Sequence, residues 1–561
     1  MSKKLLALLL IVLLTISIMA GCVSRNKDTN AGTNTGVKTD ANANAGANAS
    51  SGQQQSQIDE EDEFAKYEPK PDVKYTIEWL GSHSNSPIPE DAEMVLYWEE
   101  KYNVDFKLWY VERSKWDEIL NVRLAGGEMP DVLTAESPDI IRSYYDQNLI
   151  LEIPKELLQK FTPKIYQTIE EVAQQEGISP WMVTTIDGKN YGIPKFNENG
   201  KYHQASVWRK DWLENVGITK VPETLEEFEV AFYKFVREDP DRNGKDDTYA
   251  LSSGYQSYGG FSSIFGAFGY IPQFWSIKDD EMVYGAIQPE MKEALTLLAK
   301  WYADGLINPE FITGENRGGH WSISHDFIEG KIGYTNNPPY YHIAPPGVYG
   351  SSGGRMYRTM AETHDMEKTL AYGRPPIGYN GKSGDVRWGL INGNGLVFNQ
   401  ELKDEPDKLG KILTIIEDMC ANFENYVLMT YGIEGKHHKV ENGQYILTLP
   451  EGVSPEEYGI GNVFVAWTGV GFDINPAQFE FGDKHAAYTN TYSNQLFTSL
   501  PSMNLYWDEL DKLQKETYIR IITGEKSPDE FDNFVAQWLQ RGGEQLLKEA
   551  NEWYNSVKSI K

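Results

Sequence analysis

Residues 73–82 read VKYTIEWLGS, a run rich in β-branched and aromatic residues that ends at a glycine. Residues of these types are enriched in strands, so the run predicts a strand. The sequence then predicts a helix over 91–101, a strand over 104–111, a helix near 113–125 and a strand over 131–135. Strands and helices that alternate at this spacing are typical of a parallel α/β sheet, which we expect in this part of the chain.

Three later helices are also indicated. Thr224 and Glu227 have the spacing of a capping box at the start of a helix over 224–238. A second helix is predicted over about 289–304, where apolar residues follow the helical period. A third is expected near the C-terminus, with Ser527 as its N-cap.

Length, charge and cysteine content exclude several classes of protein. A chain of 561 residues suits two or three lobes better than one domain. Its 82 acidic and 52 basic residues give a formal charge of −30, which makes binding to nucleic acid or to an anionic membrane surface through net charge a poor hypothesis. The only cysteines are Cys22 and Cys420, so a disulfide scaffold and a cysteine-based zinc cluster are both excluded. We expect Cys420 to be a buried, inert thiol.

The first 22 residues set the expected compartment. Lys3 and Lys4 precede an apolar run over 5–18, which has the length of a signal-peptide core and is short for a membrane span. Small residues then precede Cys22, and this pattern resembles the bacterial lipobox, with Met19 where leucine is usual. The resemblance implies a signal peptide over 1–21 and lipidation of Cys22, with a palmitate-type acyl chain among its anchors. The alternative is an ordinary secretory signal with an incidental cysteine.

Residues 22–65 predict a lipidated cysteine and a disordered linker. The segment is made mostly of Asn, Ala, Gly, Thr, Ser and Gln and contains almost no large apolar residue. A flexible tether of this length reaches about 35 Å. We therefore expect a globular body anchored by lipid at the extracytoplasmic face of the cell membrane.

Several stretches in the globular part share their order and spacing with one family of proteins. They are DGKNYGIP (187–194), WRKDWL (208–213), NVGI (215–218), PET (222–224), EEF (226–228), EAL (293–295), GLINPE (305–310) and GKIG (330–333). Together with the lipobox they make the chain, over roughly 70–555, similar to the extracellular solute-binding lipoproteins of bacterial ABC sugar importers, in the oligosaccharide-type family 1.

This resemblance implies an α/β protein with the two-lobe, type II periplasmic-binding-protein fold. The implied N-terminal lobe comprises 66–196 and 388–432, and the C-terminal lobe comprises 197–387 and 433–561. The chain is expected to cross between the lobes near 194–206, 374–388 and 430–440. It also implies an oligosaccharide ligand in the inter-lobe cleft, delivery to the permease subunits of an ABC transporter, and a monomeric receptor that binds no nucleic acid.

An acidic loop predicts a structural calcium ion. The stretch 239–247 reads DPDRNGKDD, close to the start of an EF-hand loop. The expected ligands are Asp239, Asp241, Asn243, the backbone carbonyl of Lys245, and Asp247. Position 12 of the loop is Ala250, where an EF-hand has a bidentate glutamate, so the loop is a partial one. An acidic turn capped by its own side chains is the alternative.

Aromatic residues in stretches rich in Gly, Asn and Ser are candidates for sugar binding, because an aromatic face covers the C–H face of a sugar while polar groups bind its hydroxyls. The first strand is followed by Ser82 and His83, at an end where α/β sheets place ligands. The aromatic candidates are Tyr255, Tyr258, Trp275, Trp321, Tyr340, Tyr341, Trp388 and Trp467. For each ring, packing in a core is the alternative, and that alternative is preferred for the tryptophans on predicted helices, Trp98, Trp116, Trp212, Trp301 and Trp538.

Motifs of enzymes are absent from the sequence. None of the nine histidines stands in H-E-x-x-H, no G-x-S-x-G occurs, and neither the phosphate loop nor the dinucleotide fingerprint is complete. A chain with so many carboxylates nevertheless leaves two rival hypotheses open. One is a lipid-anchored enzyme that degrades glycans with an Asp/Glu pair, and the other is a receptor for a peptide or another polar solute. The acidic surplus mildly disfavours a uronate ligand.

Overall fold

The structure is a computed structural model, and it describes residues 63–82, 86–111, 116–202, 204–313, 319–349, 352–468, 475–487 and 491–558. The chain divides into residues 1–61 and a compact unit over 62–561. The predicted signal peptide, Cys22 and nearly all of the predicted linker lie outside the described residues. The compact unit builds its cores from its own side chains, so we expect it to fold without the preceding residues.

The first lobe is built on a five-stranded sheet with the order β2-β1-β3-β13-β6. β1 is parallel to β2 and β3, whereas β13 is antiparallel to both β3 and β6. The carboxyl ends of β1, β2, β3 and β6 therefore meet at one edge of the sheet. The strands are β1 (Tyr75–Leu80), β2 (Val104–Leu108), β3 (Val132–Ala135), β6 (Ile193–Phe196) and β13 (Ile391–Phe398).

Helices cover this sheet with apolar side chains. On α14, for example, Leu409, Ile412, Leu413 and Ile416 repeat at helical spacing and are fully buried. The helices of the first lobe are α1 (Glu93–Tyr102), α2 (Trp116–Ala125), α3 (Pro138–Asp146), α4 (Lys155–Phe161), α5 (Pro163–Glu176), α14 (Pro406–Cys420) and α15 (Phe423–Tyr431). Cys420 is buried in this core, and its burial raises the pKa of the thiol to about 11.

The second lobe contains a small antiparallel sheet with the order β10-β7-β11. Its strands are β7 (Val207–Arg209), β10 (Tyr334–Thr335) and β11 (Leu370–Tyr372). Two hydrophobic clusters flank it, a large one that includes Trp208 and Trp301 and a smaller one around Tyr340 and Met356. In the described residues, no helix of either lobe is both long and apolar enough to cross a bilayer.

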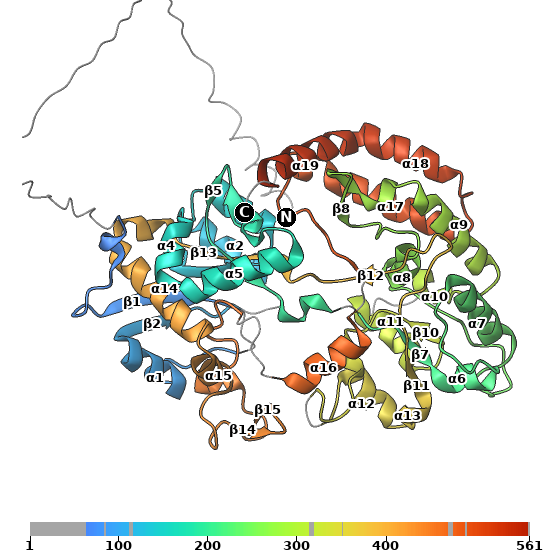
Figure 1. Cartoon of the computed structure of the whole chain (residues 1–561), viewed down its shortest axis with the longest axis horizontal. Coiled ribbons are helices and arrows are strands. Elements are labelled where there is room, and N and C mark those ends of the chain that lie inside the picture. The colour runs from blue at the N-terminus through green and yellow to red at the C-terminus, as the bar shows by residue number, and fades with distance from the viewer. Residues whose placement is uncertain are drawn as a thin grey trace, which may run out of the picture. The chain divides into compact units, whose positions relative to one another are not determined.

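Most helices of the second lobe contribute to the large cluster. They are α6 (Lys210–Asn215), α7 (Leu225–Arg237), α8 (Ser262–Gly266), α9 (Glu290–Ala303), α17 (Met503–Ile522), α18 (Glu530–Trp538) and α19 (Glu544–Val557). The helices that contribute side chains to the smaller cluster are α11 (Gly319–Ile328), α12 (Arg355–Ala361), α13 (Met366–Thr369) and α16 (Pro476–His485). Figure 1 shows α1, α4, α5 and α14 gathered around the first sheet, and α6, α7, α9 and α17 gathered in the second lobe.

The helix boundaries read from the sequence are largely confirmed. The capping box is present: the Thr224 hydroxyl accepts from the Glu227 N–H at 3.2 Å, and the Glu227 carboxylate accepts from the Thr224 N–H, also at 3.2 Å. The predicted start of the C-terminal helix is wrong. Residues 528–529 form a turn, and α18 begins at Glu530 with Asp529 as its N-cap. The Ser527 hydroxyl stabilises the turn by accepting from the Asp529 N–H at 3.3 Å, so it does not cap the helix.

The first core extends further along the chain than the sequence suggests. It includes Phe464 and Trp467, which lie beyond 432. The ring of Phe464 meets that of Phe106 at 4.9 Å, edge to face, so the chain returns to the first sheet after the hairpin β14 (His438–Glu441) and β15 (Gln444–Leu447).

Candidate functional site

Two segments that connect the lobes run side by side. One follows β6 toward β7, and the other leads into β13. The Asn197 N–H donates to the Leu390 carbonyl, and the Gly389 N–H donates to the Gly200 carbonyl, both at 3.0 Å. A third segment joins them, because β12 (Asp385–Val386) pairs in parallel with β16 (Thr491–Tyr492). Such paired connections form a hinge, at which a few residues can absorb the movement of one lobe against the other.

A buried lysine lies at the edge of the first sheet where its parallel strands end. The Lys195 ammonium donates to the Thr134 hydroxyl at 2.9 Å and to the Gly81 carbonyl at 3.1 Å. The Thr134 hydroxyl also donates to the Gly81 carbonyl. Lys195 forms no ion pair with any residue that the structure describes, and burial lowers its pKa to about 8. The side chain therefore holds the loop after β1 through neutral oxygens.

The facing edge of the second lobe carries a buried carboxylate. Asp385 accepts from the Ser262 hydroxyl at 2.6 Å, from the Asn336 side-chain amide at 2.8 Å and from the Val386 N–H at 2.7 Å. Burial raises its pKa to about 6, although these donors lower it. Asn336 follows β10, and its Oδ1 has no hydrogen-bond partner among the described residues. This edge therefore holds a fixed set of amide, hydroxyl and carboxyl groups next to the hinge.

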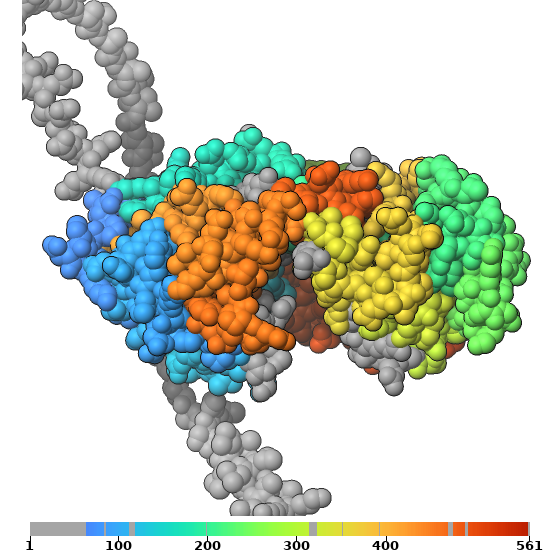
Figure 2. All heavy atoms as spheres, turned by 90° about the horizontal axis from the view of Figure 1, so that it is seen from below, coloured from blue at the N-terminus to red at the C-terminus, as the bar shows by residue number. Residues whose placement is uncertain are grey.

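Contacts at two places join the lobes around these edges. Near the hinge, the Arg387 guanidinium pairs with Glu176 at the end of α5. Further away, the Gln444 side chain of the hairpin donates to the Gly347 carbonyl of the second lobe. Figure 2 shows the surface hollowed between the orange residues of the first lobe and the yellow residues of the second.

Four of the aromatic candidates are buried inside one lobe. The Tyr258 hydroxyl accepts from Gln514 at 2.5 Å, and the Tyr340 hydroxyl donates to Asn199 at 2.6 Å. Trp275 packs on Tyr284 with a centroid distance of 5.0 Å, and the Trp467 indole donates to the Pro194 carbonyl at 3.0 Å. These contacts occupy all four rings, and the exposed fraction of each is 5% or less: Tyr258, Trp275, Tyr340 and Trp467.

The structure brings two other candidates together at the hinge. Tyr341 and Trp388 are both half-buried, and their ring centroids are 6.4 Å apart. Tyr255 is 39% exposed and its hydroxyl accepts from the side chain of the next residue at 2.9 Å, while Ser82 is half-buried after β1. His83 and the side chain of Trp321 lie outside the described residues.

The acidic loop folds around the side chain of Asn243. Its amide nitrogen donates to Asp241 at 2.7 Å and to Asp247 at 3.0 Å. The Asp239 carboxylate accepts from the backbone N–H of Asn243 at 3.1 Å and from that of Gly244 at 3.0 Å. Burial, together with the neighbouring carboxylates, raises the pKa of Asp241. Two carboxylates therefore converge on the side-chain amide of Asn243, and a third caps the backbone of the same loop.

This arrangement fits a calcium ion in part. Among the residues that the structure describes, no group of three or more His, Cys, Asp or Glu side chains has the geometry of a metal site. However, rotation of the Asn243 amide by half a turn would direct its oxygen toward Asp241 and Asp247, and oxygen is the ligand that calcium takes. Burial and the neighbouring carboxylates disfavour the charged form of Asp241, and a cation bound here would favour it.

Sequence reasoning missed three polar residues at the hinge, namely Lys195, Asp385 and Arg387. Lys195 lies in the stretch DGKNYGIPK, directly after the family-like residues 187–194, yet a lone lysine carries no signal of burial. Asp385 and Arg387 both precede the candidate Trp388 in GDVRWG, so two charged residues next to that tryptophan could have indicated a polar site there.

Two α/β lobes joined by paired crossing segments define the class of two-lobed solute-binding proteins. The chain belongs to the family of bacterial extracellular solute-binding proteins, whose sequence pattern matches residues 81–406. Members of this family are receptors of ABC transporters, so the protein is a solute-binding receptor rather than an enzyme.

Individual relatives show how far this likeness extends. The polygalacturonan/rhamnogalacturonan-binding protein YtcQ of Bacillus subtilis (strain 168) is 25% identical over 506 residues, which cover 87% of this chain and 93% of the relative. Lipoprotein LipO of the same organism is 24% identical over 506 residues, which cover 86% and 93%. The crystal structure of the alginate-binding protein AlgQ2 without calcium ion superposes with a TM-score of 0.57 at 15% identity, covering 86% of this chain and 98% of that one, which is a likeness of fold.

Proposed function

We propose that this protein is a lipid-anchored receptor that binds an oligosaccharide between its lobes and delivers it to an ABC permease. The observation that carries the proposal is the pair Tyr341 and Trp388, two half-buried rings 6.4 Å apart beside the hinge. A ring that retains exposed surface next to a hinge can stack on a sugar when the lobes close.

The polar groups next to the hinge stiffen the site without touching the sugar. Asp385 and Asn336 are buried, and Asp385 is fixed by three donors. A site whose supporting groups are already fixed loses little conformational entropy when the ligand binds.

The charge of the ligand is a separate question. The names of two relatives refer to polymers of acidic sugars, polygalacturonan and alginate. Lys195 places a buried ammonium, held by neutral oxygens, at the edge of the first sheet. An acidic oligosaccharide is therefore included with neutral ones in the test below, despite the overall charge of −30.

The lipid anchor and the calcium ion are parts of the same proposal. Support for the anchor comes from the lipobox-like residues before Cys22 and from a relative named as a lipoprotein. Two acyl chains hold a protein stably where one does not. Metabolic labelling with a fatty acid, compared between the native chain and Cys22→Ala, tests it: label that persists in the variant contradicts lipidation at this residue.

A calcium ion in the loop 239–247 would be held by Asp239, Asp241, Asn243, the Lys245 carbonyl and Asp247. The ion would neutralise the converging carboxylates and add stability to the folded state, because it binds that state alone.

The decisive experiment uses residues 62–561 and a panel of neutral and acidic oligosaccharides, with a peptide mixture beside them. Calorimetry should give binding of one glycan class, and small-angle scattering should show a smaller radius of gyration for that complex. Binding of peptides alone would replace the sugar with another polar solute. Binding without compaction would contradict closure around the ligand.

A further inference from the structure

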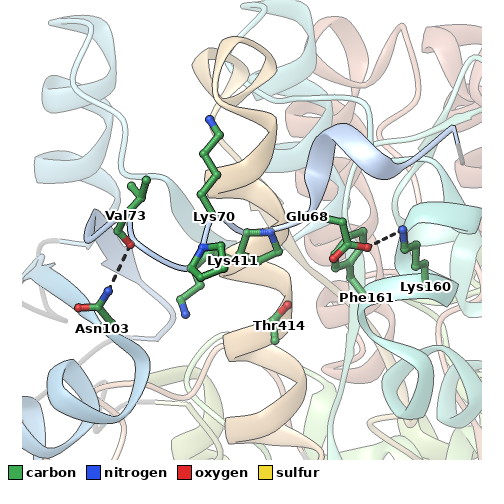
Figure 3. A pocket seen from close by; sticks show the side chains of 10 residues that line it. Glu68, Lys70, Val73, Asn103, Lys160, Phe161, Lys411 and Thr414 are labelled. Carbon is green, nitrogen blue, oxygen red and sulfur yellow. Dashed lines mark hydrogen bonds and ion pairs between the residues drawn. The ribbon is translucent and has the colours of Figure 1, made fainter. Parts of the chain in front are cut away.

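A pocket of about 500 Å³ opens in the first lobe, where the N-terminal segment crosses α14 and the end of α4 (Figure 3). The segment supplies one wall and the two helices supply the other. The lining residues are Glu68, Pro69, Lys70, Pro71, Val73, Asn103, Lys160, Phe161, Lys411 and Thr414. None of these residues belongs to the hinge or to the facing edges of the two lobes.

The charge of the pocket is opposite to that of the whole chain. Its lining contains three lysines but one carboxylate, whereas the chain carries a formal charge of −30. Lys160 pairs with Glu68 at 2.7 Å, and Lys70 pairs with Asp407 at 2.8 Å. Lys411 forms no ion pair with any residue that the structure describes. One positive charge in the pocket is therefore not balanced.

Lys411 is also the lysine whose environment disfavours its charge. Its side chain is half-buried on α14, and burial lowers its pKa. An ammonium that has lost part of its hydration without gaining a counter-ion interacts strongly with an anion that enters, because the local dielectric is low. Figure 3 shows Lys411 next to Lys70, whereas Lys160 lies at the other end of the pocket, where it pairs with Glu68.

The wall opposite α14 depends on a close backbone approach. The short helix Ala65–Tyr67 precedes the lining residues, and the Tyr67 carbonyl oxygen lies 1.7 Å from where a Cβ of Gly410 would be. Any side chain at position 410 would push the segment away from α14. Glycine at this position therefore allows the pocket to form.

We propose that this pocket binds the phosphate group of an organic phosphate. Among the described residues of the lining, Lys411 supplies the unpaired ammonium, which acts on a phosphate oxygen as a point charge. Lys70 and Lys160 add to the positive field, although each already pairs with a carboxylate. The volume leaves room for the organic part of the molecule beside Pro69, Pro71 and the ring of Phe161.

Two sources could supply this chemistry. The segment that forms the wall follows directly on the residues that would tether the body to a membrane, so the headgroup of a glycerophospholipid is one source. A soluble phosphate ester is the other. The shared feature is the phosphate group, and the binding assay separates the sources.

The test uses residues 62–561 in two arms. Calorimetry measures binding of glycerol 3-phosphate, and co-sedimentation measures binding to phosphatidylcholine vesicles with and without phosphatidylglycerol. Lys411→Gln should weaken binding by roughly 5- to 10-fold, as expected for the loss of one unscreened charge contact. Lys512→Gln removes a charge from an exposed position on α17 in the other lobe and should leave binding unchanged.

A second variant tests the shape of the pocket without changing its charge. Gly410→Ala keeps every lysine but displaces the wall, and it should weaken binding as much as Lys411→Gln does. Binding of glycerol 3-phosphate alone assigns a soluble ester, and additional binding to the phosphatidylglycerol vesicles assigns a headgroup. Absence of binding in both arms, or equal effects of the substitutions at 411 and 512, would overturn the proposal.

Discussion

Gly389 donates its backbone N–H to the carbonyl oxygen of Gly200 at 3.0 Å, and a Cβ added to Gly200 would lie only 1.9 Å from the Gly389 oxygen. The two connections between the lobes therefore touch backbone to backbone. A side chain at position 200 would leave no room for this contact, so the geometry of the hinge depends on glycine at that position.

Gly200→Ala should therefore destabilise the protein and impair closure. Two effects oppose each other: alanine lowers the entropy of the unfolded chain, worth about 0.4–1 kcal/mol, while overpacking costs about 1–3 kcal/mol. The clash is with backbone, which cannot rotate away, so the second effect should dominate. Urea denaturation measures the net loss, and scattering with bound ligand measures closure.

Gly259→Ala is the matched control for this substitution. Its added Cβ would meet nothing closer than the Ser257 hydroxyl, at 3.4 Å, which is an ordinary contact. The control should change the free energy of unfolding by less than about 1 kcal/mol. An equal loss in the free energy of unfolding in the two variants would show that the contact between Gly200 and Gly389 does not contribute specifically to stability.

The sequence predicts elements well where local pattern decides them. Trp98, Trp212 and Trp301 lie on predicted helices, and each is fully buried as their periodic spacing indicates. The capping box of Thr224 and Glu227 is likewise a local signal, and it forms as expected. Such features depend on residues within a turn or two of one another.

The sequence does not predict contacts between residues that are far apart in the chain. Tyr258 lies in a stretch rich in Gly and Ser that predicts an exposed loop, yet Gln514, 256 positions away, covers its hydroxyl. The partners of Lys195 are 61 and 114 positions away. Tyr258 is buried because α17 packs over its loop, and Lys195 is buried because of the order in which the strands pair. A short stretch of sequence predicts neither arrangement.

Trp388→Ala should weaken binding of the oligosaccharide. Removing a half-buried ring that stacks on a sugar should cost about 1–2 kcal/mol, a loss of roughly 5- to 30-fold in affinity. Tyr97→Ala is a suitable control, because Tyr97 is 40% exposed on α1 and lies outside the segments that cross between the lobes. Calorimetry with the glycan found in the panel gives both values. Unchanged affinity in Trp388→Ala would remove the ring pair from the binding site.

Calcium should stabilise the protein through the loop 239–247. At a concentration 100 times its Kd, the ion adds about 2.7 kcal/mol, which in a unit of this size raises Tm by about 2–3 °C. Asp241→Asn should abolish this rise. It should also stabilise the calcium-free protein, because burial and the neighbouring carboxylates raise the pKa of Asp241 and so disfavour its charged form. Scanning calorimetry with calcium and with a chelator measures both effects.

Asp246→Asn provides the control for the calcium loop. Asp246 is exposed and stands between the expected ligands Lys245 and Asp247, so it removes the same charge without removing a ligand. The rise of Tm with calcium should persist in this variant. A rise that survives Asp241→Asn would place the ion elsewhere or assign the effect to general screening of charge.

Asp385 should make stability fall as the pH rises. Its pKa is about 6 in the folded protein, where it is buried, against about 3.9 in an unfolded chain. Below about pH 4 both states are protonated and the stability is fully present. Between about pH 4 and pH 6 the unfolded state releases its proton first, so roughly 3 kcal/mol is lost by neutral pH.

Asp385→Asn should remove this loss, because asparagine stays neutral throughout. The hydrogen bonds that the substitution alters shift stability equally at every pH, and the unpaired Oδ1 of Asn336 can accept from the new amide after a half-turn. The informative quantity is therefore the difference between the two proteins at pH 4.5 and at pH 7.5. In Asp365→Asn the sign should reverse and the change should lie below about pH 4, because Lys368 lowers the pKa of the exposed Asp365 below its value in the unfolded chain. Parallel pH profiles for the native protein and Asp385→Asn would mean that this carboxyl group ionises as easily in the folded protein as in water.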